Sequence, residues 1–139
     1  MPGTRTLFGV AVAARNDDGL VLVGRRYVEP GAPLALPGGK PEPGETIEHC
    51  AVRELAEETG LVLDPSGVRT FACVLMSGDD ISWAVAGVEG VLETGAGQQS
   101  PRELEPEKFG EFCWIDPAAP PEGLFAATHA LPARLPGRR

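Results

Sequence analysis

An abrupt change in composition at residue 45 constrains this chain more than any other feature. Residues 29–44 contain nine glycines and prolines, a density at which neither a helix nor a long strand persists. Residues 45–59 (ETIEHCAVRELAEET) contain none and consist mostly of helix formers. The sequence therefore predicts a loop, with a short extended piece around residues 34–36, that runs directly into a helix over residues 45–59.

The predicted helix has one apolar face and recognisable ends. Ile47, Ala51 and Leu55 recur every four residues, which places them in a stripe that packs against a core. Gly60 follows the last helical residue, where a left-handed glycine commonly ends a helix. Glu45 lies at the start, where a negative charge interacts favourably with the positive end of the helix dipole.

The rest of the chain reads mainly as strands. Five apolar stretches are predicted strands, over residues 7–14, 20–24, 68–76, 81–92 and 109–115. An Asp-Gly turn joins the first two, which predicts a hairpin over residues 6–25. Residues 93–107 read as a loop and residues 124–131 as a short helix. Strands around a long helix, with another helix near the end, indicate an α/β fold in three layers. The length of 139 residues is that of one domain, over 1–139.

Three carboxylates share one side of the predicted helix. Glu54, Glu57 and Glu58 stand three and four residues apart, so they lie close together and repel one another. A hard divalent cation removes this repulsion, and oxygen ligands without His or Cys favour Mg²⁺ or Mn²⁺ over Zn²⁺. The alternative is a solvated acidic face. Gly38 and Gly39 favour the first interpretation, because they let the loop backbone approach an ion or ligand closely.

Residues 39–61 (GKPEPGETIEHCAVRELAEETGL) resemble the Nudix box, G-x5-E-x7-R-E-U-x-E-E-x-G-U with U aliphatic. All nine specified positions match: Gly39, Glu45, Arg53, Glu54, Leu55, Glu57, Glu58, Gly60 and Leu61. The preceding strand pair is similar to the first hairpin of the family. Residues 105–108, 112–116 and 124–125 are similar to those of the small nucleotide diphosphatase subgroup. The resemblance covers most of residues 7–128 and implies a Nudix α/β/α sandwich, in which a mixed sheet carries the loop-helix and a C-terminal helix.

Nudix enzymes hydrolyse a diphosphate linked to another moiety, usually with Mg²⁺, and the resemblance implies roles for the matching residues. The implied metal ligands are Glu54, Glu57, Glu58 and the carbonyl of Gly38. Glu45 would brace the helix and Gly60 would end it, while Arg53 would orient a carboxylate. The general base would be Glu54 or Glu57, because a carboxylate not fully used in coordination accepts the proton of the attacking water.

Many relatives add a carboxylate from a late loop, for which Glu103, Glu105 and Glu107 are candidates. We favour Glu107, because it stands immediately before the strand over residues 109–115. The alternative for all three is a charged surface loop.

The expected substrate contacts are Arg25 or Arg26, Gly39, Lys40 and Phe125. Strand alternation puts the two arginines on opposite faces, so at most one of them pairs with a phosphate. Phe125 and Trp114 are candidates for stacking on a base, although core packing is the commoner fate of such rings. Cys50 reads as a packed thiol among acidic neighbours, and His49 and His129 as structural or exposed.

Charge and cysteines limit the partners and the compartment. Twelve basic and twenty acidic residues give a net charge of −8, which argues against nucleic-acid and anionic-membrane partners. A polyphosphate delivered as its metal complex remains compatible with this charge. Three widely spaced cysteines read as reduced thiols. With no long apolar run and no signal peptide, they lead us to expect a cytoplasmic protein.

Three functions follow from the residues and the resemblance. The first is Mg²⁺-dependent hydrolysis of a nucleoside or deoxynucleoside triphosphate to the monophosphate and pyrophosphate. The second keeps the fold but takes ADP-ribose or a nucleotide sugar. The third is a non-catalytic nucleotide sensor. Members of the family often form homodimers, which makes dimerisation an expectation for this chain.

Overall fold

The computed structural model describes residues 5–94, 99–125, 128 and 135. Its elements are β1 (Arg5–Arg15), β2 (Val21–Arg26), β3 (Leu34–Ala35), β4 (Gly38–Gly39), α1 (Ile47–Thr59), η1 (Pro65–Gly67), β5 (Arg69–Met76), β6 (Ile81–Val91) and β7 (Phe109–Ile115). The predicted α/β class is confirmed. Of the predicted C-terminal helix, Thr128 has helical backbone, and most of the remainder, with His129, lies outside the described residues.

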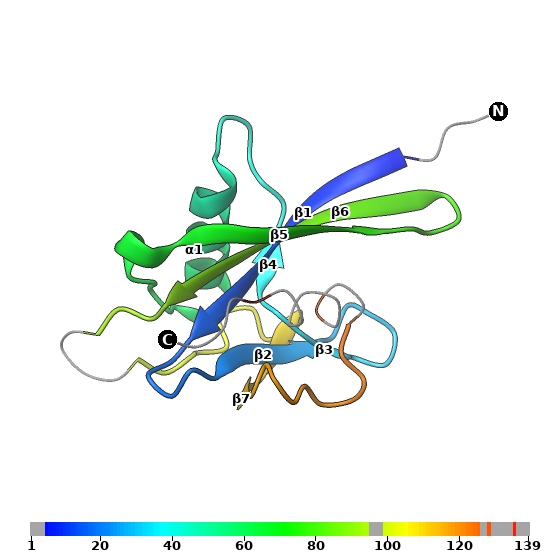
Figure 1. Ribbon diagram of the computed structural model, residues 1–139. Helices are drawn as coiled ribbons and strands as arrows, with labels where there is room; N and C mark the ends of the chain where they lie inside the picture. Colours follow the sequence, from blue (N-terminus) through cyan, green and yellow to red (C-terminus); the bar gives the residue numbers. More distant parts are fainter. Residues whose placement is uncertain (1–4, 95–98, 126–127, 129–134, 136–139) are drawn as a thin grey trace.

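The seven strands of the described residues form one mixed sheet, and five of them follow the order β3-β2-β1-β6-β5. β1 runs parallel to β6 over its whole length, from Arg5↔Ile81 to Arg15↔Val91, and β5 pairs antiparallel with β6. β7 pairs with β2 on the far side. In Figure 1, α1 lies against the face of the long strands, while β2, β3 and β7 form a separate part of the sheet below them.

The predicted hairpin over residues 6–25 is wrong beyond its turn. In the described residues, the pairing of β1 with β2 is limited to Arg15↔Val21, next to the turn. The glycine strand β4 instead occupies this edge of β1, through Val10↔Gly39 and Ala11↔Gly38. β2 diverges from β1 for that reason, and it pairs with β3 and β7. The loop before α1 is thereby built into the sheet.

Both faces of β1 are buried, which explains its continuous apolar sequence. Val10, Val12 and Ala14 point into a core with α1. Ala11 and Ala13 point into a second core on the opposite face. The predicted stripe of the helix is confirmed, since Ala51 and Leu55 are buried and Ile47 packs beside them. The sheet therefore separates two packed layers.

The ends of α1 follow from its capping residues. The hydroxyl of Thr46 accepts a hydrogen bond from the backbone N–H of His49 at 3.0 Å, so the helix begins at Ile47 rather than at residue 45. Gly60 has φ 77° and its N–H donates to the carbonyl of Ala56, as predicted for a helix-ending glycine. Within the described residues, no helix has the length and apolarity needed to cross a membrane.

Candidate active site

Two glycines bring the loop backbone against both the sheet and the helix. A Cβ on Gly38 would lie 2.0 Å from the carbonyl oxygen of Val10. A Cβ on Gly39 would lie 2.3 Å from the carboxyl carbon of Glu54. No side chain fits at Gly38, because the contact is with the β1 backbone, whereas a side chain at Gly39 would require the Glu54 carboxyl group to move. The carboxyl group of Glu54 consequently lies directly against the β4 backbone.

Arg53 is the centre of the acidic cluster. Its Nε and Nη2 donate to the two carboxylate oxygens of Glu45 at 2.6 and 2.8 Å, a bidentate pair that fixes the guanidinium plane. Nη1 then donates to Glu54 at 2.9 Å and to Glu57 at 3.2 Å. Nη2 also bonds the carbonyl of Lys40 at 3.1 Å. Arg53 thus joins the helix carboxylates to the loop.

Burial and contact with Arg53 separate the carboxylates. The Arg53 hydrogen bonds lower the pKa of Glu45 to about 2, and its side chain is 6% exposed. The side chain of Glu54 is 16% exposed and that of Glu57 is 52% exposed. Burial raises the pKa of Glu54, against the opposing effect of Arg53. Glu45 is therefore an ionised brace, and Glu54 is the more enclosed of the other two.

Glu58 lies behind the loop rather than beside Arg53. Its Oε1 accepts a 2.8 Å hydrogen bond from the backbone N–H of Gly38. Burial, together with the charges of Glu54 and Glu105, raises the pKa of Glu58 to about 8, against the opposing effect of the Gly38 hydrogen bond. Carboxylates that raise one another's pKa in this way favour a cation between them.

Burial and charge in the late loop favour Glu105 over Glu107, the residue expected from the sequence. Glu105 is half-buried, and its charge contributes to the raised pKa of both Glu54 and Glu58. The backbone N–H groups of Lys108 and Phe109 both bond the carbonyl of Glu105. This turn leaves Glu107 exposed. Glu105 is therefore the loop carboxylate whose charge reaches the helix carboxylates in the described structure.

The donor set suits a hard divalent cation. Glu54, Glu57, Glu58 and Glu105 supply oxygen donors only, the chemistry that Mg²⁺ and Mn²⁺ prefer. Across the described ranges, no three His, Cys, Asp or Glu side chains stand ready-made around one point as a metal site. Arg53 holds Glu54 and Glu57, so a bound cation would compete with this guanidinium for their oxygens.

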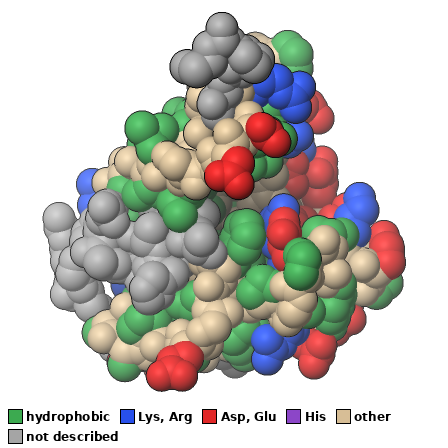
Figure 2. All heavy atoms as spheres, turned by 90° about the vertical axis from the view of Figure 1, so that its right-hand side faces the viewer, with side chains coloured by type: hydrophobic (Ala, Val, Ile, Leu, Met, Phe, Trp, Pro, Cys, Tyr) green, Lys and Arg blue, Asp and Glu red, His purple; other side chains and the backbone are tan. Residues whose placement is uncertain are grey.

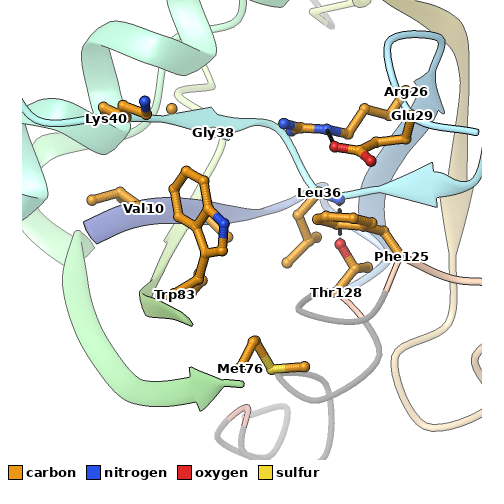
Figure 3. A pocket seen from close by; sticks show the side chains of 14 residues that line it. Val10, Arg26, Glu29, Leu36, Gly38, Lys40, Met76, Trp83, Phe125 and Thr128 are labelled. Atoms are coloured by element: carbon orange, nitrogen blue, oxygen red, sulfur yellow. Dashed lines mark hydrogen bonds and ion pairs between the residues drawn. The ribbon is translucent and has the colours of Figure 1, made fainter. Parts of the chain in front are cut away.

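An apolar pocket of about 270 Å³ opens beside this cluster. Trp83 and Phe125 stand on opposite sides of it, with Met76 at its base and the Gly38 strand above (Figure 3). The ring of Trp83 has the Lys40 ammonium 5.5 Å from its centre. The ring of Phe125 has the Arg26 guanidinium 5.2 Å from its centre. Two aromatic walls below a cationic rim form a slot for a flat, negatively substituted ligand.

The two arginines separate as strand alternation predicts. Arg26 lines the pocket and lies 3.4 Å from Glu29, whereas Arg25 donates to the carbonyl of Ala32 at 3.2 Å. In Figure 2, many acidic and basic side chains lie close together along the right-hand side of the view. Arg26 also lowers the pKa of Glu58. Its charge therefore acts on both the pocket and the acidic cluster.

Trp114 and Cys50 belong to the core, whereas Trp83 and Met76 line the pocket. Trp114 packs against the helix-side core and is not among the pocket residues. Cys50 is fully buried, and burial raises the pKa of its thiol to about 11, in agreement with a packed thiol. Trp83 and Met76 were missed from the sequence. Their positions on strands were visible, but the face they occupy depends on the pairing Met76↔Trp83.

Comparison with known sequences agrees with this arrangement. A family model described as the NUDIX domain matches residues 5–134. A protein of Methanocaldococcus jannaschii named ADP-ribose pyrophosphatase is 46% identical over 47 residues, which cover 34% of this chain and 28% of that protein. Nudix hydrolase 25 of Arabidopsis thaliana is 46% identical over 61 residues, covering 44% and 33%. The matches thus span about a third or less of these relatives.

Solved structures share the fold over nearly the whole chain. A MutT NUDIX hydrolase from Burkholderia pseudomallei has a TM-score of 0.79 at 24% identity, covering 95% of this chain and 99% of its own. The MutT protein from Methanosarcina mazei Go1 has a TM-score of 0.73 at 21% identity, covering 96% and 95%. At this identity the likeness concerns the fold. The family match over residues 5–134, carried by this fold, shows that the chain belongs to the Nudix family.

Proposed function

We propose that this protein hydrolyses a nucleoside triphosphate to the monophosphate and pyrophosphate, with Mg²⁺ or Mn²⁺. The observation that carries the proposal is the continuity between pocket and acidic cluster. Gly38 lines the pocket, and its N–H donates to Glu58 at 2.8 Å. A base between Trp83 and Phe125 would therefore direct its phosphates along the cationic rim toward the carboxylates.

The residues divide the work by position. Glu54, Glu57, Glu58, Glu105 and the Gly38 carbonyl would hold the cation. Such a cation neutralises diphosphate oxygens and acidifies an attacking water.

Arg26 and Lys40 would bind phosphate oxygens, since both cations lie over the rings of the slot. Gly39 would leave room for the substrate, and Arg53, fixed by Glu45, would orient Glu54.

We assign proton acceptance to Glu54 rather than Glu57. Arg53 orients both carboxyl groups, donating to Oε1 of Glu54 at 2.9 Å and to Oε2 of Glu57 at 3.2 Å, so burial is what distinguishes them. The Glu54 side chain is 16% exposed, against 52% for Glu57. An enclosed, oriented carboxylate is better suited to take a proton from water at a defined point.

ADP-ribose is the second candidate substrate, and one observation favours it. The Methanocaldococcus jannaschii relative named ADP-ribose pyrophosphatase is 46% identical over 47 residues. A pocket of about 270 Å³ is small among ligand sites, which typically span roughly 300–1,000 Å³. A single base fits this size better than two nucleoside ends, so we rank triphosphates first.

A nucleotide panel with identified products tests the proposal. Nucleoside triphosphates, ADP-ribose and a nucleotide sugar are incubated with the protein and Mg²⁺. We expect monophosphate and pyrophosphate from a triphosphate, and loss of activity by orders of magnitude in Glu58→Gln. Glu122→Gln, which alters an exposed carboxylate elsewhere, serves as the control. Tight binding without turnover would instead indicate a sensor.

We further infer a cytoplasmic location, supported by three free cysteines, Cys50, Cys73 and Cys113, which suit a reducing compartment. A homodimer remains an expectation from the family, and sedimentation of the purified protein measures it directly.

A further inference from the structure

The segment that carries Glu105 is fastened on both sides of that residue. On its N-terminal side, Gln99 forms a paired contact with Val62. The Val62 N–H donates to Gln99 Oε1 at 2.8 Å, and Gln99 Nε2 donates to the Val62 carbonyl at 2.9 Å. Nε2 also donates to the carbonyl of Glu93 at 2.7 Å. The Gln99 amide thus forms the same pair of hydrogen bonds with Val62 that a neighbouring strand would form. These bonds hold the segment next to the end of α1.

Arg102 adds a second attachment to the helix. Its backbone N–H donates to the carbonyl of Thr59 at 2.9 Å. Its guanidinium covers Gly60 so closely that a Cβ there would lie 2.6 Å from Nη2. A cation at this position also suits the negative end of the helix dipole. The C-terminus of α1 is therefore joined to the segment three residues before Glu105.

Glu103 attaches the segment to β7. Its Oε2 accepts a 3.2 Å hydrogen bond from the backbone N–H of Glu111. Its carboxyl carbon fills the space where Gly110 would carry a Cβ, 2.8 Å away. Glu111 has φ 49°, a left-handed conformation that a non-glycine residue keeps only when its surroundings impose it. The hydroxyl of Tyr27 donates to Glu111 Oε2 at 2.6 Å and supplies part of that constraint.

These contacts leave Glu105 little freedom. Between the attachments, its carbonyl accepts from the N–H groups of Lys108 and Phe109 at 2.9 and 3.0 Å. The charge of Glu105 reaches both Glu54 and Glu58. Bringing a fourth carboxylate close to Glu54, Glu57 and Glu58 costs free energy through repulsion, so the attachments must oppose its displacement.

We propose that Glu103 is a positioning residue of the site. By accepting from the Glu111 N–H and packing on Gly110, it anchors the segment that carries Glu105 and so keeps Glu105 available for cation binding. Gln99 and Arg102 support the same segment from the helix side. The inference rests on the proposed function, in which Glu105 is a metal ligand. A purely structural Glu103 would affect stability without acting through Glu105.

Mn²⁺ binding without nucleotide tests the proposal, measured by calorimetry on the full chain. We expect Glu103→Ala to weaken binding about tenfold, the lower end of the effect typical for residues that orient metal ligands. Glu103→Gln keeps the acceptor oxygen and should bind nearly as wild type does. Glu122→Ala removes an exposed carboxylate outside the segment and controls for net charge.

The decisive comparison is made in a Glu105→Gln background. If Glu103 acts through Glu105, adding Glu103→Ala to Glu105→Gln weakens Mn²⁺ binding no further. Undiminished weakening in the double variant would overturn the proposal, as would unchanged Mn²⁺ affinity in Glu103→Ala or no Mn²⁺ binding by wild type. Amide hydrogen exchange should be faster at residues 108–111 in Glu103→Ala.

A second variant covers the case in which Glu103→Ala does not fold. Gly110→Ala keeps the carboxylate but places a methyl group 2.8 Å from its carbon, so it should displace Glu103 and reproduce the loss of Mn²⁺ affinity. Wild-type affinity in this variant counts against the proposal. Because the Mn²⁺ experiment contains no nucleotide, it tests the coupling between Glu103 and Glu105, whereas the nucleotide panel tests hydrolysis. A failure of one proposal can therefore be distinguished from a failure of the other.

Discussion

The backbone N–H of Gly38 donates a 2.8 Å hydrogen bond to Oε1 of Glu58, and this contact joins the sheet to the acidic face of the helix. Gly38 is also paired with Ala11 of β1. The position of Glu58 is therefore set by the sheet as well as by α1. Substitutions in β4 should consequently affect both folding and the carboxylate cluster.

Gly38→Ala should destabilise the protein. The added Cβ would lie 2.0 Å from the Val10 carbonyl, so β4 must move away from β1, and overpacking of this kind costs about 1–3 kcal/mol. Urea unfolding measures the loss. Gly67→Ala is the control, because a Cβ there meets nothing within 4 Å, and it should be neutral or slightly stabilising. Equal stability of the two variants would contradict the close approach of β4.

Arg53→Lys should lower kcat by roughly 10- to 100-fold, the effect typical of lost ligand orientation. Lysine keeps the charge but cannot hold both oxygens of Glu45 while also reaching Glu54. KM for the nucleotide should change little, because the pocket residues remain. Arg69→Lys, which alters the exposed 2.8 Å pair with Glu89, provides the matched control. A rise in KM alone would assign Arg53 to substrate binding instead.

Trp83→Ala should raise KM with little change in kcat. The ring forms one wall of the pocket, and stacking on a base contributes about 1–3 kcal/mol, or roughly 5- to 150-fold in affinity. Steady-state kinetics with the best nucleotide of the panel measures the change. Phe8→Ala removes a ring that is 39% exposed and outside the pocket, and its KM should equal that of wild type. A common effect in both variants would point to lost stability.

Tyr27 should titrate late. It is the single tyrosine of the chain, so phenolate absorbance reports on it alone. The hydrogen bond to Glu111 is the main reason that its pKa rises from 10.0 to about 12. The folded pKa exceeds the unfolded one, so this contribution to stability is complete below pH 10 and is lost as the pH rises toward about 12.

Glu111→Ala should return the Tyr27 titration toward 10, because it removes both the hydrogen-bond acceptor and the negative charge beside the hydroxyl. An unshifted titration in wild type would show that the Tyr27–Glu111 contact is absent in solution. The same titration in Glu103→Ala reports whether Glu111 keeps its place.

Local patterns in the sequence were sufficient for the helix and its cluster. Spacing along one helix fixes which side Glu54, Glu57 and Glu58 share, and Gly60 marks the end without any knowledge of the fold. The alternation of Arg25 and Arg26 is equally local. These predictions depend on neighbours within a few residues, where backbone geometry leaves few alternatives.

Long-range pairing accounts for what was missed. The hairpin over residues 6–25 failed because β4, two glycines from a loop, takes the edge of β1. Trp83 could not be placed, since its face depends on how β6 pairs with β1 and β5. Proximity to the strand favours Glu107 in the sequence, whereas the turn closed by the Glu105 carbonyl leaves Glu107 exposed and Glu105 half-buried.

The backbone of β4 at Gly38 and Gly39 separates the pocket from the carboxylate cluster and contacts both of them. Gly38 contacts the pocket with one side and Glu58 with its N–H, and it has no room for a side chain because a Cβ would collide with the Val10 carbonyl. A change in base preference cannot be made at Gly38 without disturbing the chemistry beyond it. If the pocket binds a base as proposed, substitutions that alter base preference are expected at Met76 and Trp83, which line it from β5 and β6.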